Sequence, residues 1–168
     1  MNRFRGSLAA CLLAALTATG CAASSGDAEA DSGDPSLVHA MKSCGIAVSD
    51  RGAAVKDAEG KVAVAPIGTD SVNIDTDPLS VLQAQYDDWG VVTAEANAAA
   101  QGDPSWQHLA TIMTDRIGLM NVWLTTRQAG IQPSSRDANI GTDIDKANSL
   151  LAEYNTICSG LALRLSDA

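Results

Sequence analysis

The cysteines are the residues of this chain with the widest choice of chemistry. Four are present, at positions 11, 21, 44 and 158. A thiol can carry a lipid, close a disulfide or bind a soft metal ion. Cys11 and Cys21 lie near the start of the chain, whereas Cys44 and Cys158 lie far apart in the remainder. The segments around each pair indicate which of these chemistries applies.

The segment before Cys21 has the composition of an export signal. Its first residues include Arg3 and Arg5, residues 6–19 are apolar or small throughout, and small residues ending in Gly20 come directly before the cysteine. A basic start, a short apolar run and a small-residue cleavage site are typical of a secretory signal peptide. The apolar run is shorter than the ~20 residues that a transmembrane helix needs. Residues 1–20 are therefore predicted to be removed during export.

Cys21 lies at the first position after this cleavage site, and in this respect the segment resembles a bacterial lipoprotein signal. The resemblance implies a diacylglycerol on the Cys21 thiol, cleavage before Cys21 and a further acyl chain on the new amino group. One acyl chain binds membranes only marginally, so several chains, palmitate among them, are needed for stable anchoring. The expected location is the outer face of the cell membrane, with the lipid on Cys21 as the membrane contact.

Two alternatives concern where and whether the lipid is attached. Lipoprotein signals favour Leu three residues before the cysteine, where this chain has Ala18. Residues 8–11, Leu-Ala-Ala-Cys, fit that tetrapeptide better, but cleavage before Cys11 would leave almost no apolar run for export. Ordinary cleavage without lipid is the second alternative. The apolar run favours Cys21 as the modified residue.

Composition divides the exported part into a tether and a domain. Residues 22–34 contain four acidic groups and no side chain larger than Glu, so residues 21–34 are predicted to form a lipidated cysteine and a disordered tether. The root-mean-square reach of such a tether is roughly 20 Å. Residues 35–168 are long enough for one domain with a core.

Charge limits the partners of this domain. The whole chain has a formal net charge of −9, and the signal contains basic but no acidic residues, so the exported part is more acidic still. An acidic domain argues against binding to nucleic acid and against electrostatic adhesion to anionic lipid.

Cys44 and Cys158 remain once Cys11 is removed with the signal and Cys21 carries lipid. Two cysteines in an exported chain most simply form one disulfide. A redox or metal-binding pair is the alternative, but such a pair would normally have C-x-x-C spacing or nearby histidines. A Cys44–Cys158 disulfide is therefore predicted.

Prolines and glycines predict where the helices begin and end. Three Asp-Pro pairs, at residues 34–35, 77–78 and 103–104, place an N-cap acceptor before a proline at the first helical position. Glycines follow the corresponding runs at positions 45, 102 and 130. A fourth helix has alternative capping boxes at Ser134 and Thr142, and Gly141 favours the later start or a break. The predicted helices are residues 35–44, 78–101, 104–129 and, for the fourth, Ser134 or Thr142 to about Leu165.

Apolar residues three and four apart give each predicted helix one buried face. Cys44 and Cys158 belong to the faces of the first and last helices, which supports the disulfide. The second face ends in small residues, so a bulkier helix should approach it near Ala96 and Ala100. The four predicted faces are Leu37, Met41 and Cys44; Leu79, Leu82, Tyr86, Trp89, Thr93, Ala96 and Ala100; Leu109, Met113, Ile117, Met120 and Leu124; and Ile144, Ala147, Leu151, Tyr154, Cys158, Leu161 and Leu165.

The pattern changes from helical to alternating between residues 46 and 66. Residues 53–56 and 61–65 flank a turn at 57–60, which predicts a small β-hairpin after the first helix, with Val62 and Val64 on one side. Val72 and Ile74 would add a short third strand. From Cys44-Gly45-Ile46 to Asp57-x-x-Gly60, the stretch also resembles small exported lipoproteins of actinobacteria that have no assigned activity. The predicted fold is mainly α, a three- to four-helix bundle with this hairpin inserted.

The two histidines are candidates for metal or haem binding. His39 lies near Met41 and His108 near Met113, and imidazole with thioether sulfur suits haem iron or copper. However, the sequence has no H-x-x-x-H, E-x-x-H or methionine-rich run. Surface histidines beside core methionines are therefore expected, and no cofactor or metal site is predicted.

Catalytic motifs are not apparent in the sequence. No serine lies in a G-x-S-x-G or S-x-x-K motif, and phosphate-binding Gly-rich loops are absent. Asp87 and Asp88 are adjacent, but neighbours on a helix point about 100° apart. We therefore do not expect an enzyme.

The tryptophans carry the remaining functional signal. Trp89 belongs to a buried face, whereas Trp106 and Trp123 are candidate contacts with a partner, because tryptophan is frequent in binding hot spots. Burial of all three in the core is the more common arrangement. The sequence thus predicts a membrane-anchored module that binds another envelope protein. A small-ligand, metal- or haem-binding lipoprotein, with a pocket between the second and third helices beside Ala96 and Ala100, is the alternative.

Overall fold

The computed structural model describes residues 33–65, 75–132, 134 and 138–168, of which 72% are helical. The predicted mainly helical fold is confirmed. The predictions for the signal peptide, for Cys11 and Cys21, for most of the tether and for a third strand at Val72 and Ile74 lie outside the described residues. The helices are α1 (Pro35–Ser43), α2 (Leu79–Gly102), the short 3₁₀-helix η1 (Pro104–Trp106), α3 (Gln107–Gln128) and α4 (Ala138–Asp167).

Two of the three Asp-Pro pairs start helices as predicted. The Asp34 carboxylate accepts a hydrogen bond from the Ser36 backbone N–H at 2.9 Å, and Asp103 accepts one from Ser105 at 2.8 Å. Each bond satisfies an amide group that a first helical turn leaves without a partner. At the remaining pair, Asp77-Pro78, the helix begins one residue later than predicted. Pro78 is the N-cap of α2 in place of Asp77, and no described side chain caps that end.

Glycines shape the ends of α1, α2 and α3. Gly45 and Gly130 have φ angles of 66° and 77°, in the left-handed region that glycine adopts readily. Gly102 has another role, because it is the last residue of α2 and lies against α1. A Cβ atom at Gly102 would lie only 2.1 Å from Ser36 Oγ, so the missing side chain allows the two helices to approach closely.

α4 is one continuous helix, and the break predicted at Gly141 is wrong. Thr142 lies inside the helix, where its Oγ1 donates a hydrogen bond to the Ala138 carbonyl at 2.9 Å. A glycine in a helix interior costs about 1 kcal/mol relative to alanine. Ile140 and Ile144, on either side of Gly141, pack against the core and offset that cost.

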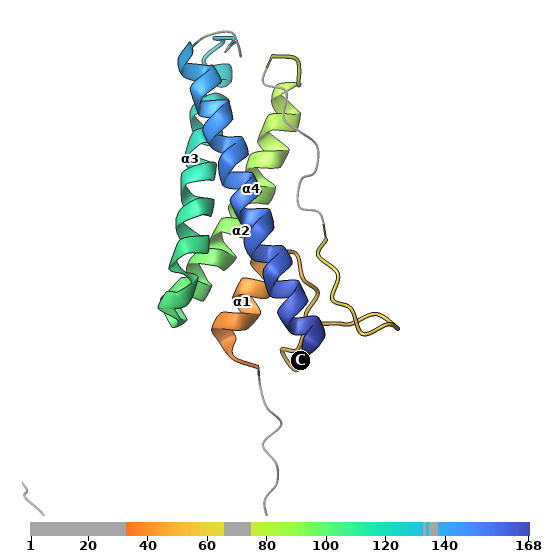
Figure 1. Ribbon diagram of the computed structural model, residues 1–168. Coiled ribbons are helices and arrows are strands. Elements are labelled where there is room, and N and C mark those ends of the chain that lie inside the picture. Colours follow the sequence, from red (N-terminus) through yellow and green to blue (C-terminus); the bar gives the residue numbers. More distant parts are fainter. Residues whose placement is uncertain (1–32, 66–74, 133, 135–137) are drawn as a thin grey trace, which may run out of the picture.

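α2, α3 and α4 are the long helices and lie side by side, with α1 at one end of them (Figure 1). α2 and α3 are antiparallel, and Thr93 Oγ1 lies 3.4 Å from the Met113 carbonyl between them. α4 runs back along α3. Among the described residues, no helix combines the length and the apolar character that crossing a membrane requires.

One hydrophobic core joins the four helices and the segment after α1. Trp89, Met41 and Leu109 are among its largest fully buried side chains. α1 packs against the end of α2 that carries small side chains, where Ala96 is completely buried, so the predicted approach of a helix is confirmed. Most predicted face positions are buried or half-buried, but Leu79 is 39% exposed.

Residues 46–65, which we name the bridged segment, do not form the predicted β-hairpin. No two of its antiparallel bridges are consecutive, so the segment contains no regular strand. The bridge between Lys56 and Val62 does enclose the turn predicted at residues 57–60. Alanine is a poor strand former, and a lone hairpin is only marginally stable. The isolated bridges join Ile46 with Val64, Val48 with Ala54, and Lys56 with Val62.

Candidate functional site

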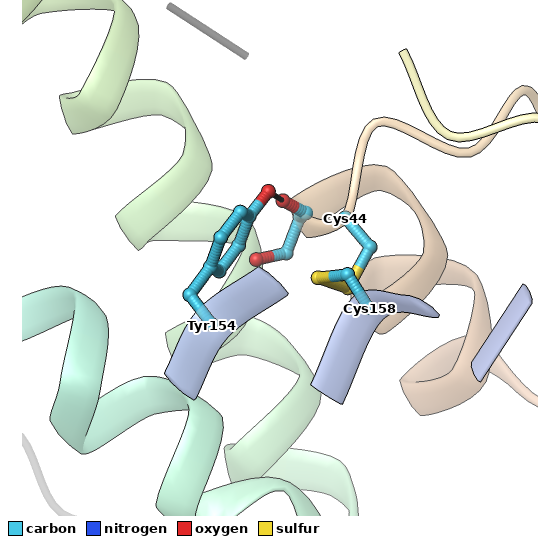
Figure 2. Close-up of a disulfide and its surroundings, with 4 residues drawn as sticks. Cys44, Tyr154 and Cys158 are labelled. Atoms are coloured by element: carbon cyan, nitrogen blue, oxygen red, sulfur yellow. Dashed lines mark hydrogen bonds between the residues drawn. A yellow bond between two sulfur atoms is a disulfide. The ribbon is translucent and has the colours of Figure 1, made fainter. Parts of the chain in front are cut away.

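Cys44 and Cys158 meet where the end of α1 contacts the C-terminal half of α4 (Figure 2). Their sulfur atoms form a disulfide and their Cα atoms are 5.2 Å apart, in agreement with the predicted pair. Both residues are almost completely buried, with exposed fractions of 0% and 1%. The disulfide therefore fixes the first helix of the domain to the last.

Tyr154 stabilises the same contact one turn before Cys158. Its hydroxyl donates a hydrogen bond to the Ser43 carbonyl at 2.9 Å (Figure 2). Burial raises the pKa of the Tyr154 hydroxyl well above its usual value, and the nearby Arg116 guanidinium opposes this shift only in part. The hydroxyl therefore stays protonated and serves as a donor.

A buried cation lies next to this contact. Arg116 of α3 is 7% exposed, and its Cζ atom lies 4.4 Å from the centroid of the Trp89 ring. Its Nη1 donates to the Ala147 carbonyl at 2.8 Å, but its Nε has no hydrogen-bond partner among the described residues. Burial lowers the pKa of the guanidinium, and Tyr154 partly opposes this shift. In the described part of the chain, Arg116 forms no ion pair, so the Trp89 ring and one carbonyl stabilise its charge.

Arg116 is not among the predicted buried residues, although its spacing carries a signal. Arg116 lies three residues after Met113 and four before Met120, which places it on the buried face of α3. The predicted face has Ile117 in that place, and Ile117 is only half-buried. Arginine is normally assigned to the surface, because a buried charge without a carboxylate partner is costly.

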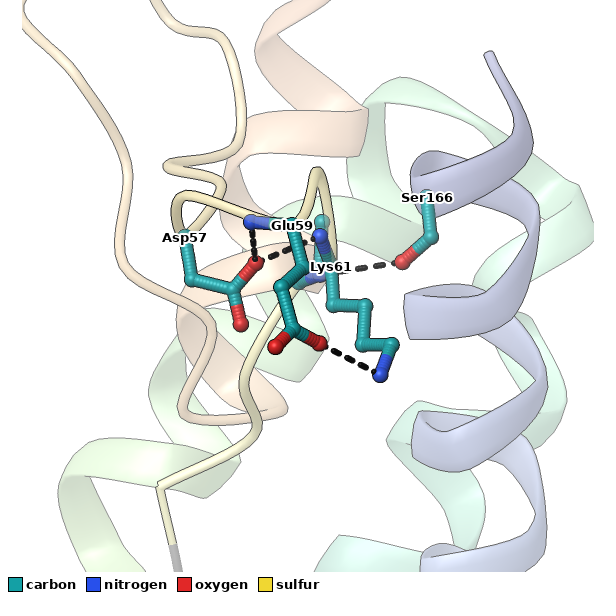
Figure 3. Close-up of polar contacts among 5 residues, drawn as sticks. Asp57, Glu59, Lys61 and Ser166 are labelled. Carbon is teal, nitrogen blue, oxygen red and sulfur yellow. Dashed lines mark hydrogen bonds and ion pairs between the residues drawn. The ribbon is translucent and has the colours of Figure 1, made fainter.

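Ser166 connects the end of α4 to the bridged segment (Figure 3). Its Oγ accepts a hydrogen bond from the Val62 N–H at 2.9 Å, and its carbonyl accepts one from Lys56 Nζ at 3.3 Å. Together with the disulfide, these contacts join α1, the bridged segment and the last turns of α4. We call these three parts the linked end of the domain.

The chain from Cys21 joins the domain at this linked end. The backbone N–H of Gly33, the first described residue, donates to the Arg51 carbonyl at 3.3 Å. A Cβ atom at Gly33 would lie 2.8 Å from the Gly52 carbonyl oxygen, so the start of the domain packs tightly against this turn. The start of the domain thus lies against the bridged segment.

Each histidine pairs with a glutamate on a neighbouring helix. His39 Nδ1 lies 2.6 Å from Glu95 Oε2 of α2, and His108 Nε2 lies 2.8 Å from Glu153 Oε1 of α4. These pairs connect α1 with α2 and α3 with α4. The described residues contain no group of three His, Cys, Asp or Glu side chains that could hold a metal ion.

The structure contradicts the proposed exposure of Trp123. Its exposed fraction is 6%, although Asn121 and Thr125 beside it are exposed. Trp123 lies three residues after Met120 and therefore shares the buried face of α3. Trp106 in η1 is half-buried and packs against the core. Of the two candidate partner contacts, Trp106 alone retains exposed surface.

Large apolar side chains are exposed at the end of the long helices opposite to the linked end (Figure 1). They belong to the first turn of α2 and to the last turns of α3 with the residues just after it. Gln128 Nε2 donates to Gln83 Oε1 at 3.3 Å and thereby connects the two helices there. We call these side chains the distal apolar residues: Leu79, Val81, Val122 and Ile131, which are 38–60% exposed.

No known protein family, curated protein or solved structure matches this chain. The function is therefore argued from the sequence and from the geometry above.

Proposed function

We propose that this protein is an exported lipoprotein, held at the outer face of the cell membrane by lipid on Cys21. We further propose that its helical domain binds another protein of the cell envelope and catalyses no reaction itself. The observation that carries the proposal is the order of features in the first 21 residues: a basic start, a short apolar run, small residues and Cys21. A thiol at that position is the chemical group to which lipid is attached.

The place where the chain enters the domain supports this arrangement. Residues 22–32 separate Cys21 from Gly33, and fully extended they span at most about 40 Å. Gly33 contacts Arg51 and Gly52 at the linked end. In an anchored protein, the tether therefore attaches at the linked end, and the distal apolar residues lie at the opposite end of the long helices.

The cross-linked core suits a binding domain. The Cys44–Cys158 disulfide and the hydrogen bond from Tyr154 to Ser43 fix the short α1 to α4. A rigid scaffold reduces the entropy that is lost when a partner binds. The domain therefore presents its surface in one fixed conformation.

The distal apolar residues are the surface that we assign to the partner. Exposed apolar side chains that occur singly are common, but here four large ones lie at one end of α2 and α3. Asp87 and Asp88, about two turns further along α2, are also exposed, and acidic groups on the same helix favour a partner with basic side chains. Trp106 lies at the other end of these helices and is not part of this surface.

Photo-crosslinking in the cell that makes the protein tests this proposal. A photoreactive residue at position 131 should capture one specific envelope protein. The same residue at the exposed position 156, on α4, is the matched control and should not capture it. Capture should also be lost in a Cys21→Ala variant, which cannot be lipidated. The proposal is wrong if position 131 captures no specific protein, or if the unanchored variant captures it equally well.

A further inference from the structure

The bridged segment has a second apolar face that is turned away from the core. Residues paired across an antiparallel bridge lie on the same face, and their neighbours in sequence lie on the opposite face. Ile46 and Val62 face the core, with exposed fractions of 3% and 9%. Of the residues at the opposite positions, Gly45 follows α1 and the polar Ser49, Asp57 and Lys61 lie at the turns, whereas the other five are exposed and apolar. We call these five apolar residues the outer face: Ala47, Ala53, Val55, Ala63 and Ala65.

The outer-face residues are neighbours in space. The Val55 N–H donates to the Ala47 carbonyl at 2.9 Å. The bridge between Ile46 and Val64 places Ala63 opposite Ala47, and the bridge between Lys56 and Val62 places it opposite Val55. Apolar residues on both faces are typical of strands that are covered on both sides. In the described structure, the helices cover the inner face at Ile46 and Val62, leave Lys56 and Val64 of that face exposed, and do not cover the outer face.

The distribution of charge favours a bilayer as the cover of the outer face. Residues 33–65 contain four acidic and four basic side chains and are neutral as a unit. The remaining described residues, 75–132, 134 and 138–168, contain eleven acidic and four basic side chains, and one of those four, Arg116, is buried. Anionic headgroups repel the acidic helices but not the neutral linked end. The negative charge of the whole chain argues against adhesion to anionic lipid, but residues 33–65 do not carry this charge.

The tether attaches to the domain at this same end. Gly33 is hydrogen-bonded to Arg51, in the turn between Val48 and Ala53, directly next to the outer face. An acyl chain on Cys21 would keep the outer face at a high effective concentration with respect to the lipid surface. A contact that is weak by itself then suffices to orient the domain.

We propose that the outer face rests on the bilayer surface beside the lipid anchor, with Val55 at its centre. This inference depends on the lipid anchor proposed above. It gives the anchored domain one preferred orientation, with the distal apolar residues directed away from the membrane.

Depth-dependent fluorescence quenching tests the contact. The full lipidated protein is reconstituted into phosphatidylcholine vesicles with or without bromine on the acyl chains, because bromine quenches tryptophan at short range. A Val55→Trp variant reports on the outer face. A Val91→Trp variant is the matched control, since Val91 is 66% exposed in the middle of α2. The wild-type protein gives the signal of the native tryptophans.

The emission added by Val55→Trp should fall about twofold in brominated vesicles, as expected for a ring buried at the headgroup boundary. The emission added by Val91→Trp should not change. Introducing Ala63→Glu into Val55→Trp should reduce quenching to the Val91→Trp level while the urea midpoint of unfolding stays the same. Equal quenching of Val55→Trp and Val91→Trp, or capture of a protein rather than lipid by a photoreactive residue at position 55, overturns the inference.

Mass spectrometry of the same samples separates the two proposals. Lipid on Cys21 without quenching at position 55 overturns the membrane contact alone. Absence of lipid from Cys21 overturns the lipoprotein proposal, and the membrane contact with it.

Discussion

Replacing Cys44 and Cys158 together by alanine should remove a large part of the free energy of unfolding. The disulfide connects residues 114 positions apart. For a loop of this length, the chain-entropy model gives a stabilisation of about 4–5 kcal/mol. A typical domain has a free energy of unfolding of roughly 5–15 kcal/mol. The loss should therefore be among the largest that any pair of substitutions causes in this protein.

The local effect should be greatest in α1. This helix has nine residues, fewer than the roughly 12–15 that an isolated helix needs. Without the disulfide, the hydrogen bond from Tyr154 to Ser43 is the remaining polar connection between α1 and α4 in the described structure. We expect the α1 amides to exchange with solvent much faster in the double variant, and those of α3 to change less.

Urea unfolding measures the effect, with the fluorescence of the buried Trp89 and Trp123 as the signal. The free energy of unfolding should fall by about 3–5 kcal/mol, and the melting temperature by roughly 10–15 °C. The reduced wild-type protein is the control, because it keeps both sulfur atoms, and it should match the variant within about 1 kcal/mol. A loss below about 1 kcal/mol, with unchanged exchange in α1, would refute the reasoning, because packing alone would then hold α1 in place.

Three further predictions follow from single side chains. Arg116→Met should leave the free energy of unfolding unchanged or raise it by up to about 2 kcal/mol, because it replaces a buried charge, with no carboxylate partner among the described residues, by an apolar chain. A loss of more than about 2 kcal/mol in urea unfolding would show that the contact with the Trp89 ring outweighs desolvation. Tyr154→Phe should lower the free energy of unfolding by about 1–2 kcal/mol, because the buried Ser43 carbonyl loses its donor. Tyr86→Phe, at a half-buried tyrosine, is the control and should change the free energy of unfolding by less than about 0.5 kcal/mol. The backbone and side chain of Ser105 lower the pKa of Asp103 by hydrogen bonding, so the stabilisation from this N-cap is complete above the ordinary carboxyl pKa and is lost as pH falls through the lowered value. Asp103→Asn should therefore reduce the acid-side dependence of stability on pH, and equal pH profiles for the two proteins would contradict the assignment.

The helices and the disulfide could be predicted because local residue types determine them. Pro35 and Pro104 fix the first turns, and Gly45 and Gly130 adopt the left-handed conformation that ends a helix. The spacing of apolar residues placed both cysteines on buried faces. Each of these signals acts over a few residues, so the sequence alone was sufficient to recognise them.

The remaining features depend on contacts between elements. Trp123 is buried because α3 is covered on the face that it shares with Met120, although Asn121 and Thr125 near it in sequence are exposed. Arg116 is tolerated in the core because the Trp89 ring from α2 and a carbonyl from α4 surround it. Gly141 continues a helix because isoleucines on both sides of it pack against the core. The spacing of Arg116 and Trp123 from the methionines of α3 indicates buried positions, but no local pattern shows which side chains surround them.

The bridged segment is the clearest case of a pattern without the expected structure. Its alternation predicted a hairpin, and the structure has isolated bridges instead of strands, one of which, between Lys56 and Val62, encloses the predicted turn. Ser166, from the last turn of α4, accepts the Val62 N–H and thereby supplies a partner from another element. The outer face was not recognised in the sequence, because alanine is compatible with exposed as well as buried positions.

Mass analysis of the protein purified from the membranes of the cells that produce it shows whether Cys21 carries lipid. We expect a chain that begins at Cys21 and carries a diacylglycerol on the Cys21 thiol, and we expect Cys21→Ala to abolish this modification. A chain that retains residues 1–20, or one that begins at Cys21 with a free thiol, would contradict this expectation.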